Sequence, residues 1–250
     1  MVHHRTVALL FAFAAWLALP GLTHAQTLPF GALDGLQPRP ERVLLIGSSS
    51  IHHGFGDALV EQLQARGGMT LTNAGRSATG LSRLDYFDWL QHARERMASA
   101  EPALVIAQFG GNDCQAIIDA DEEVVARWGD DAWDDAYAAR LRALTEIVHA
   151  AGARLVFVGM PRMRSPSFSR RISHVNGIVE RVAAESDAVY LSTWALTSDG
   201  ERPRTTLRVD GTSYPMREDD GIHLSVRGAH MVAAAILSEL ETLYDLRALE

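Results

Sequence analysis

A single cysteine, Cys114, is present among the 250 residues, so the chain cannot form an internal disulfide and its fold is not a cross-linked one. Basic residues are in the minority, with 23 Lys and Arg against 31 Asp and Glu and a formal net charge of −8. A balance of this sign argues against a nucleic-acid partner, which would require a basic patch. The sequence also lacks internal repeats and low-complexity tracts. These absences are consistent with a globular protein, and the acidic charge does not argue against binding of neutral substrates.

One long apolar run is present, and it lies near the start of the chain. Residues 7–20 are almost wholly apolar, Arg5 precedes them, and Thr23-His24-Ala25 follows where a signal peptidase would cleave. This pattern predicts a secretory signal peptide over residues 1–25. The alternative is a membrane anchor, but a span needs about 20 apolar residues and this run is shorter. We therefore expect a periplasmic or secreted protein that keeps no stable membrane anchor after cleavage.

The rest of the chain predicts one domain that follows a short leader. Residues 26–41 contain three prolines and two glycines and are expected to be irregular. Residues 42–250 alternate short apolar runs with amphipathic stretches. The expected strands are 43–46, 69–73, 103–109, 155–158 and 189–191, and the expected helices are 57–66, 82–99, 131–151, 169–186 and 225–243.

This alternation predicts an α/β fold. Strands that are apolar throughout suit a sheet buried on both faces, and helices between strands imply parallel strands joined by crossovers. The expected architecture is a three-layer α/β/α domain with a central parallel sheet, of flavodoxin-like kind. Residues 114–129 and 197–219 do not fit the alternation, and connections of this length are often substrate loops.

Reactive residue types collect where the expected strands end. Ligands of an open parallel sheet bind beyond the carboxyl ends of its strands, so residues there are the first candidates for a site. Three such segments follow strands, and a fourth stands just before the last helix. In chain order they are Gly47-Ser48-Ser49-Ser50, Asn73-Ala74-Gly75, Gly110-Gly111-Asn112-Asp113 and Asp220-Gly221-Ile222-His223.

Taken alone, each segment has an ordinary interpretation. Serine and glycine commonly cap helices and fill turns, and a lone histidine is most often a solvated loop residue. Asp220 and His223 differ, because their spacing on a turn can bring the carboxylate to one ring nitrogen and leave the other facing the site. A serine hydroxyl needs such a base, since it is a weak nucleophile until its proton is removed. The four segments together therefore favour a serine hydrolase.

The same segments resemble the four sequence blocks of the SGNH (GDSL) hydrolase superfamily, which run Gly-Asp-Ser, a glycine, Gly-x-Asn-Asp and Asp-x-x-His. Residues 47–49, Gly75, residues 110–113 and residues 220–223 match them in order. Thr79-Gly80-Leu81, followed by Asp85-Tyr86-Phe87-Asp88-Trp89, is similar to the exported bacterial branch called DUF459. The resemblance spans about residues 41–245 and implies the SGNH hydrolase fold.

The resemblance also implies a role for each matching residue. Ser49 attacks an ester carbonyl, His223 takes the proton and returns it to the leaving alcohol, and Asp220 orients His223. The oxyanion is held by the backbone N–H groups of Ser49 and Gly75 and by the side-chain amide of Asn112. Preplaced donors of this kind stabilise the negative charge that develops on the carbonyl oxygen.

Two departures from the family pattern leave alternatives open. Ser48 stands where the family has aspartate, so Ser48 or Ser50 could present the reactive hydroxyl, although counting from Gly47 selects Ser49. Gly80 is the alternative to Gly75 as the glycine of the second block. Ser48, Gly80 and Asp113 are further candidates for substrate contact.

Other reactive residues have simpler interpretations. Adjacent His52 and His53 point in different directions and lack a third ligand, so neither a metal site nor a cofactor is expected. Cys114 is expected to be a small buried residue rather than a second nucleophile. Three tryptophans could form a sugar platform or belong to the core, and four arginines could contact an anion or be solvated. These are Trp128, Trp133 and Trp194, and Arg162, Arg164, Arg170 and Arg171.

The sequence thus predicts an exported serine esterase that hydrolyses O-acyl esters, chiefly O-acetyl esters, on a cell-envelope or extracellular glycan. Its partner is an acylated carbohydrate or another small ester, and the sequence does not indicate an oligomeric state. A glycan O-acyltransferase would use the same acyl-enzyme, and a lipid esterase or thioesterase would differ only in pocket lining. A non-catalytic glycan-binding or assembly protein is suggested by Ser48 and opposed by the presence together of Asn112, Asp220 and His223.

Overall fold

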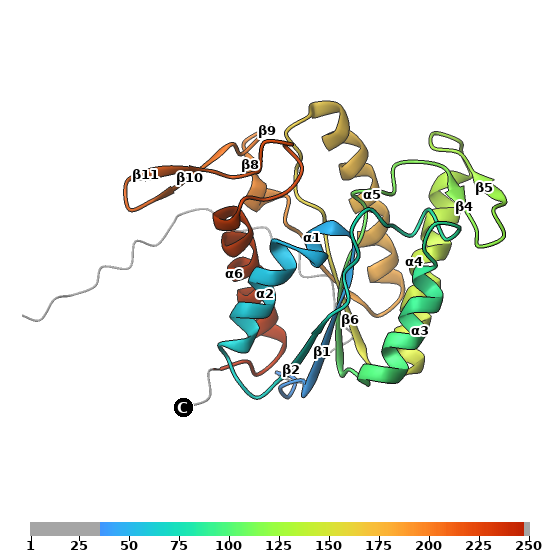
Figure 1. Ribbon diagram of the computed structural model, residues 1–250, viewed down its shortest axis with the longest axis horizontal. Helices are drawn as coiled ribbons and strands as arrows, with labels where there is room; N and C mark the ends of the chain where they lie inside the picture. Colours follow the sequence, from blue (N-terminus) through green and yellow to red (C-terminus); the bar gives the residue numbers. More distant parts are fainter. Residues whose placement is uncertain (1–35, 248–250) are drawn as a thin grey trace, which may run out of the picture.

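A five-stranded parallel sheet lies at the centre of the computed structural model, which describes residues 36–247 (Figure 1). All four strand pairings are parallel, and the order is β2-β1-β3-β6-β7. In that order the strands are Thr70–Asn73, Arg42–Gly47, Leu104–Gln108, Arg154–Val158 and Val189–Leu191. The α/β fold expected from the sequence is confirmed.

Helices cover both faces of the sheet (Figure 1). On one side lie α2 (Phe55–Gln64) and α6 (Val226–Leu243). The other side carries α3 (Trp89–Ala100), α4 (Trp133–Ala150) and α5 (Pro166–Glu185).

The side chains of strand β1 are divided between the two faces of the sheet. Leu44 and Ile46 belong to the cluster beneath α3, α4 and α5, whereas Val43 and Leu45 belong to the cluster beneath α2 and α6. Because alternate residues enter different cores, a strand at this position must be apolar throughout.

Two helices begin three or more residues away from the predicted start, and the other three begin within two residues of it. The helix expected from residue 82 begins at Trp89, where the Asp88 side chain caps it by accepting a hydrogen bond from the backbone N–H of Gln91 (2.9 Å). Ser82 is instead bonded through its backbone and hydroxyl to buried Asp113, which holds residues near it out of a helix. The helix expected from residue 169 begins at Pro166, because proline is well tolerated in a first helical turn.

Several short elements were not predicted. Helix α1 (Ser49–His52) follows β1 directly. The two segments outside the alternation contain three antiparallel hairpins, and a 3-10 turn, η1 (Ala195–Thr197), leads into the second of them. The hairpins pair β4 (Ile117–Ile118) with β5 (Val124–Ala126), β8 (Ser198–Asp199) with β9 (Arg202–Pro203), and β10 (Thr206–Val209) with β11 (Thr212–Pro215).

The predicted signal peptide and most of the predicted leader lie outside the described residues. The end of the leader runs against the domain, where Gln37 forms a bridge with Tyr244 and Arg39 donates to the carbonyl oxygen of Gly67 (2.6 Å). Within residues 36–247, no helix combines the length and the apolar character that crossing a membrane requires.

Candidate active site

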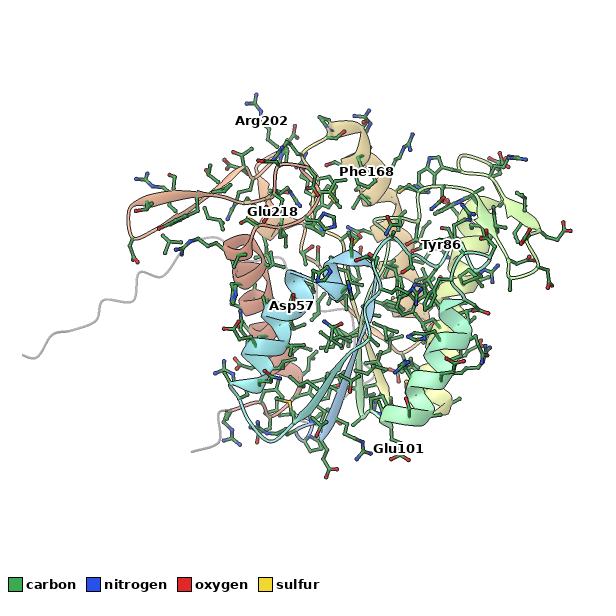
Figure 2. The ribbon with its side chains drawn as sticks, in the orientation of Figure 1. Asp57, Tyr86, Glu101, Phe168, Arg202 and Glu218 are labelled. Atoms are coloured by element: carbon green, nitrogen blue, oxygen red, sulfur yellow. The ribbon has the colours of Figure 1, made fainter. Side chains whose placement is uncertain are left out.

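The segments singled out in the sequence meet at the edge where the parallel strands end. Figure 2 shows Glu101 at the opposite edge, where β3 begins, whereas Phe168 and Glu218 lie toward the end that carries the site. Gly47 ends β1 with a φ of 151°, and a Cβ there would stand 2.3 Å from the carbonyl oxygen of Gln108. Only glycine permits this approach, which lets the chain turn at once into α1 and sets Ser49 at its first position.

The three consecutive serines have different surroundings. Ser48 is buried, with 2% of its surface exposed. The hydroxyl of Ser50 donates to Oε1 of buried Gln108 (2.6 Å), and Nε2 of Gln108 donates to the carbonyl oxygen of Gly159 (3.2 Å). Only the Ser49 hydroxyl meets a histidine, at 2.8 Å from Nε2 of His223. The geometry therefore selects Ser49 among the three.

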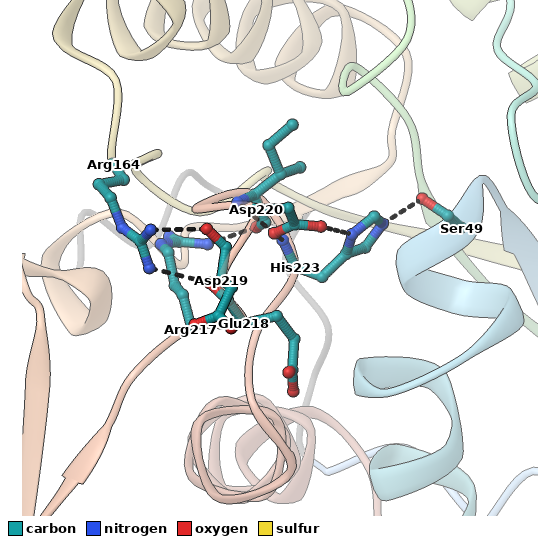
Figure 3. Close-up of polar contacts among 8 residues, drawn as sticks. Ser49, Arg164, Arg217, Glu218, Asp219, Asp220 and His223 are labelled. Carbon is teal, nitrogen blue, oxygen red and sulfur yellow. Dashed lines mark hydrogen bonds and ion pairs between the residues drawn. The ribbon is translucent and has the colours of Figure 1, made fainter.

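Asp220, His223 and Ser49 form one continuous chain of hydrogen bonds (Figure 3). Nδ1 of His223 lies 2.6 Å from Oδ2 of Asp220. The other carboxylate oxygen accepts from the backbone N–H groups of Ile222 (2.8 Å) and His223 (3.0 Å). Because a carboxylate only accepts, the hydrogen is on Nδ1, and Nε2 is left to accept the proton of Ser49.

The charge of Asp220 is consistent with this tautomer. Burial opposes ionisation of Asp220, but its bonds to the His223 ring and to the N–H groups of Ile222 and His223 outweigh burial. The pKa of Asp220 is therefore below its ordinary value, and the group remains a carboxylate at neutral pH.

Arg164 holds the loop that carries this pair (Figure 3). Its two terminal nitrogens donate to the carbonyl oxygens of Asp219 and Glu218, both at 2.8 Å. Its backbone N–H donates to the carbonyl oxygen of Gly221 (3.0 Å), whose φ is 70° and whose Cβ would stand 2.8 Å from Cβ of Arg164. Arg164 was expected to be solvated or to contact an anion; it is exposed, and its guanidinium also binds backbone carbonyl groups.

Arg217 supports the same loop from inside the protein. The residue is 4% exposed, and its guanidinium donates to the carbonyl oxygens of Ile222 (2.6 Å) and Arg162. Burial, assisted by the charge of Arg164, lowers the pKa of Arg217 to about 10, so it remains a cation at neutral pH. Sequence reasoning missed this residue, because a buried arginine that binds carbonyls has no local pattern.

Gly75 of the second block is joined to α1. Its carbonyl oxygen accepts from Nδ1 of His52 (2.8 Å), and a Cβ at Gly75 would stand 2.4 Å from the backbone nitrogen of His52. Its N–H donates to Oδ1 of Asn73 (2.9 Å), and Nδ2 of Asn73 donates to the carbonyl oxygen of Ile51 (2.8 Å). To donate to an oxyanion, this N–H would have to be shared with Asn73 or released from it.

Asn112 has a donor to spare. One hydrogen of its side-chain amide bonds to the carbonyl oxygen of Thr79 (2.9 Å), which orients the amide and leaves the second hydrogen for another acceptor.

His52 and His53 pack ring against ring, with centroids 4.0 Å apart. Among the described residues, no group of three or more His, Cys, Asp or Glu side chains is arranged to hold a metal ion.

Asp113 and Gly80 have structural roles. Asp113 is fully buried, which raises the pKa of its carboxyl, and the carboxyl accepts from the N–H groups of Gly110 (2.7 Å) and Ser82 (2.9 Å). A Cβ at Gly80 would stand 2.3 Å from Oδ1 of Asp113. Substrate contact was expected of Asp113, Gly80 and Ser48, and burial of all three argues against it.

Of Cys114 and the three tryptophans singled out in the sequence, only Trp133 is fully buried. Burial raises the pKa of Cys114 to about 12, so its thiol is protonated at neutral pH and unsuited to nucleophilic attack. Trp133 is buried and stacks on Tyr137 with centroids 5.0 Å apart, which makes it a core residue. Trp128 and Trp194 are only partly buried, and Arg171 and Arg162 lie over their rings.

A model of the family described as "Protein of unknown function (DUF459)" matches residues 42–239. The chain belongs to the DUF459 family. The curated proteins include no match to the chain. The match covers all four sequence blocks and agrees with the branch that the sequence resembles.

Solved structures show the wider relationship of this DUF459 protein. It is similar to a GDSL-like lipase from Bacteroides thetaiotaomicron, with a TM-score of 0.58 and 18% identity over 80% of this chain and 88% of that chain. It is also similar to a catalytic mutant of an acetylxylan esterase from Geobacillus stearothermophilus, with a TM-score of 0.57 and 17% identity over 86% of this chain and 100% of that chain. These likenesses show that the DUF459 protein has the SGNH hydrolase fold.

The first prediction concerns the nucleophile. A fluorophosphonate probe should form its adduct on Ser49, because this hydroxyl alone among the three serines contacts His223. Ser49→Ala should abolish labelling and lower kcat toward an ester by about 10⁶-fold, as nucleophile removal does in other serine hydrolases. Ser50→Ala is the matched control and should retain the adduct. Mass spectrometry that located the adduct on Ser48 or Ser50 would contradict the assignment.

The second prediction concerns the base. His223→Ala should be nearly as damaging as loss of Ser49, and Asp220→Asn should fold but lose about 10⁴-fold, the size of the equivalent loss in a protease triad. Because the pKa of Asp220 lies below its ordinary value, Asp220 stays ionised at neutral pH, and kcat/KM should fall only at acid pH, where protonation of Asp220 removes the acceptor of Nδ1 of His223. A rate that did not depend on ionisation of Asp220 at acid pH would count against this pair.

The third prediction concerns the loop. Arg164→Met removes two hydrogen bonds to the carbonyl groups that precede Asp220, so kcat should fall about 10- to 100-fold through misplacement of the imidazole, with little change in KM. Arg170→Met, at an exposed position of α5, is the matched control, and this variant should keep the wild-type kcat. Equal kcat values for the two variants would show that Arg164 does not position the loop.

Proposed function

We propose that this DUF459 protein is an exported serine esterase that hydrolyses O-acyl esters, chiefly O-acetyl esters, on a cell-envelope or extracellular glycan. The observation that carries the proposal is the hydrogen-bonded chain from Asp220 through His223 to Ser49. Its direction, with the ring N–H toward the carboxylate and the free lone pair toward the hydroxyl, is the one that base-assisted attack on a carbonyl requires.

In the acylation step, Nε2 of His223 takes the proton of Ser49 as its oxygen attacks the ester carbonyl. The carbonyl oxygen gains a negative charge, which the backbone N–H of Ser49 and the free hydrogen of Asn112 would stabilise, with Gly75 as a third donor. Collapse of this intermediate breaks the bond to the alcohol oxygen. The imidazolium, stabilised by Asp220, donates its proton to that oxygen, and the sugar hydroxyl leaves.

In the deacylation step, water takes the place of the departed alcohol. His223 removes a proton from this water as it attacks the acyl group, and then returns the proton to the Ser49 oxygen as the free acid is released. Ser49 and His223 end the cycle in the protonation states in which they began it, so the cycle requires no cofactor. The same acyl-enzyme would give an acylated sugar if a sugar hydroxyl attacked in place of water.

The serine at position 48 is compatible with catalysis. In the family pattern an aspartate precedes the nucleophile, and we attribute to it a role in supporting the turn. Gln108 supports the turn here, since its side chain accepts from Ser50 and donates to Gly159, and its backbone oxygen accepts from the N–H of Ser48 (3.3 Å). A separate anchor for the nucleophile favours an enzyme over a binding protein that has lost its first block.

Two considerations support a glycan substrate outside the cytoplasm. The apolar start of the sequence predicts export, which would bring the protein to envelope and extracellular glycans. One structural neighbour with the same fold is a catalytic mutant of an acetylxylan esterase, and xylan is a glycan.

The fourth prediction tests this function. The purified protein should release p-nitrophenol from p-nitrophenyl acetate and acetate from an acetylated oligosaccharide, and Ser49→Ala should release neither. When an unacetylated oligosaccharide is added to an acyl donor, free acid should form faster than acylated sugar, because a strand-end site has no evident means of excluding water.

The outcomes separate the alternatives. Faster accumulation of acylated sugar would favour an O-acyltransferase and leave the roles of Ser49, His223 and Asp220 unchanged. Hydrolysis of long acyl esters or thioesters alone would favour a lipid esterase or thioesterase. Failure to cleave any ester, together with failure to bind a fluorophosphonate, would reject the enzyme and favour a glycan-binding protein.

A further inference from the structure

A hollow of about 420 Å³ lies on the surface near the start of α4 and has no role in the chemistry described above. It is formed where the chain that follows β5 meets the first turn of α4 and one side of α5. Its volume is within the range of about 300–1,000 Å³ that is typical of small-molecule sites. Its lining residues are Trp128, Gly129, Asp130, Asp131, Trp133, Asp134 and His174.

Trp128 is the partly exposed aromatic wall of the hollow. Its ring meets Trp133 nearly at right angles, with centroids 4.5 Å apart, and meets His174 in the same way at 5.9 Å. Trp133 is buried and stacks on Tyr137, so the contact behind Trp128 is part of the core. The indole is therefore held in place before any ligand arrives, which reduces the entropic cost of binding.

Polar groups in the hollow divide into those already used and those left free. Nε2 of His174 and Oδ1 of Asp134 are paired at 2.7 Å, and Nε1 of Trp133 donates to the carbonyl oxygen of Gln115 (2.7 Å). Within residues 36–247, the indole N–H of Trp128 and the carboxylate of Asp131 have no hydrogen-bond partner. The hollow thus offers one free donor and at least one free acceptor beside an aromatic ring.

The hollow is connected to the segment that carries Asn112. The carbonyl oxygen of Gln115 binds Trp133, and Nε2 of Gln115 donates to the carbonyl oxygen of Asn112 (2.5 Å). Two hydrogen bonds therefore link the back wall of the hollow to the proposed oxyanion donor. A chain-like substrate with its ester at Ser49 would lie on the same edge of the protein.

We propose that this hollow is a sugar subsite that binds a neutral pyranose unit of the glycan chain, away from the unit whose ester is cleaved. The proposal rests on the function proposed above. The apolar face of the sugar packs on Trp128, hydroxyl groups donate to the carboxylates of Asp131 and Asp134, and the indole N–H donates to a sugar oxygen. Three aspartates line the hollow against one cation, Arg171, whose guanidinium carbon lies 5.9 Å from the centroid of the Trp128 ring, so a negatively charged uronic acid is disfavoured there.

Binding is tested on the Ser49→Ala protein with unacetylated xylotetraose, cellotetraose and chitotetraose, by calorimetry and by quenching of tryptophan fluorescence. At least one neutral oligosaccharide should bind, and Trp128→Ala should weaken it about tenfold, the effect of losing roughly 55 Å² of apolar contact. Trigalacturonate should bind more weakly than the neutral sugars. If none of the three neutral sugars binds, or if trigalacturonate binds best, the proposal is wrong.

Two milder variants keep the test independent of folding. Trp128→Phe retains the aromatic packing on Trp133 and removes the indole N–H, and Asp131→Asn retains the shape of an exposed side chain and removes its charge. Both should weaken oligosaccharide binding, whereas Asp121→Asn, the same change on the preceding loop and outside the hollow, should not. Unchanged affinity in Trp128→Phe, Trp128→Ala and Asp131→Asn would overturn the subsite.

Hydrolysis of a small ester separates this inference from the proposed function. With p-nitrophenyl acetate, which cannot reach the hollow while it reacts, Trp128→Ala and Asp131→Asn should match the wild type, and with an acetylated tetrasaccharide they should raise KM. Equal KM values on the tetrasaccharide would reject the subsite and leave the esterase intact. Failure of the wild type to cleave either ester or to bind a fluorophosphonate would reject the esterase, while sugar binding to Ser49→Ala would still report on the hollow.

Discussion

The hydrogen bond between the Asp220 carboxylate and Nδ1 of His223 is the interaction on which the site depends. It decides which ring nitrogen carries the hydrogen, and therefore whether the nitrogen that faces Ser49 can accept a proton. The bond requires that the four-residue turn from Asp220 to His223 keep its shape, and several contacts around the turn hold it. Arg164 and Arg217 hold the carbonyl groups of the turn from its exposed and buried sides, and Gly221 leaves room for Arg164.

Ser49, the proposed nucleophile, is supported by a separate set of contacts. Gly47 allows β1 to approach β3 closely, and Gln108 reaches from the end of β3 to Ser50 on one side and Gly159 on the other. The two halves of the site are far apart in the sequence, and a hydrogen bond joins Ser49 of one to His223 of the other. Because their supports are independent, damage to one should change turnover without unfolding the other.

The two segments that interrupt the alternation of strands and helices contain none of Ser49, Asp220 and His223. Residues 197–219 form two hairpins and lead into the turn that carries Asp220, and residues 114–129 form one hairpin and then lead to Trp128. Both arise at the edge where the strands end, so they can differ in shape without disturbing the sheet. This arrangement separates the hydrogen-bonded chain of Asp220, His223 and Ser49 from the surfaces that would select a substrate.

The sequence by itself determined the α/β/α architecture, the order of its elements and the residues that meet at the strand ends, because burial periodicity and turn chemistry are local properties. It left open which of Ser48, Ser49 and Ser50 faces the histidine, and it misplaced the start of α3. Tertiary structure decided these points. The Ser50 hydroxyl is hydrogen-bonded to Gln108, and Ser48 is buried. Ser82 is hydrogen-bonded to Asp113, which holds it out of the helix. Each of these contacts joins residues that are distant in the chain, so it exists only once the strands are side by side.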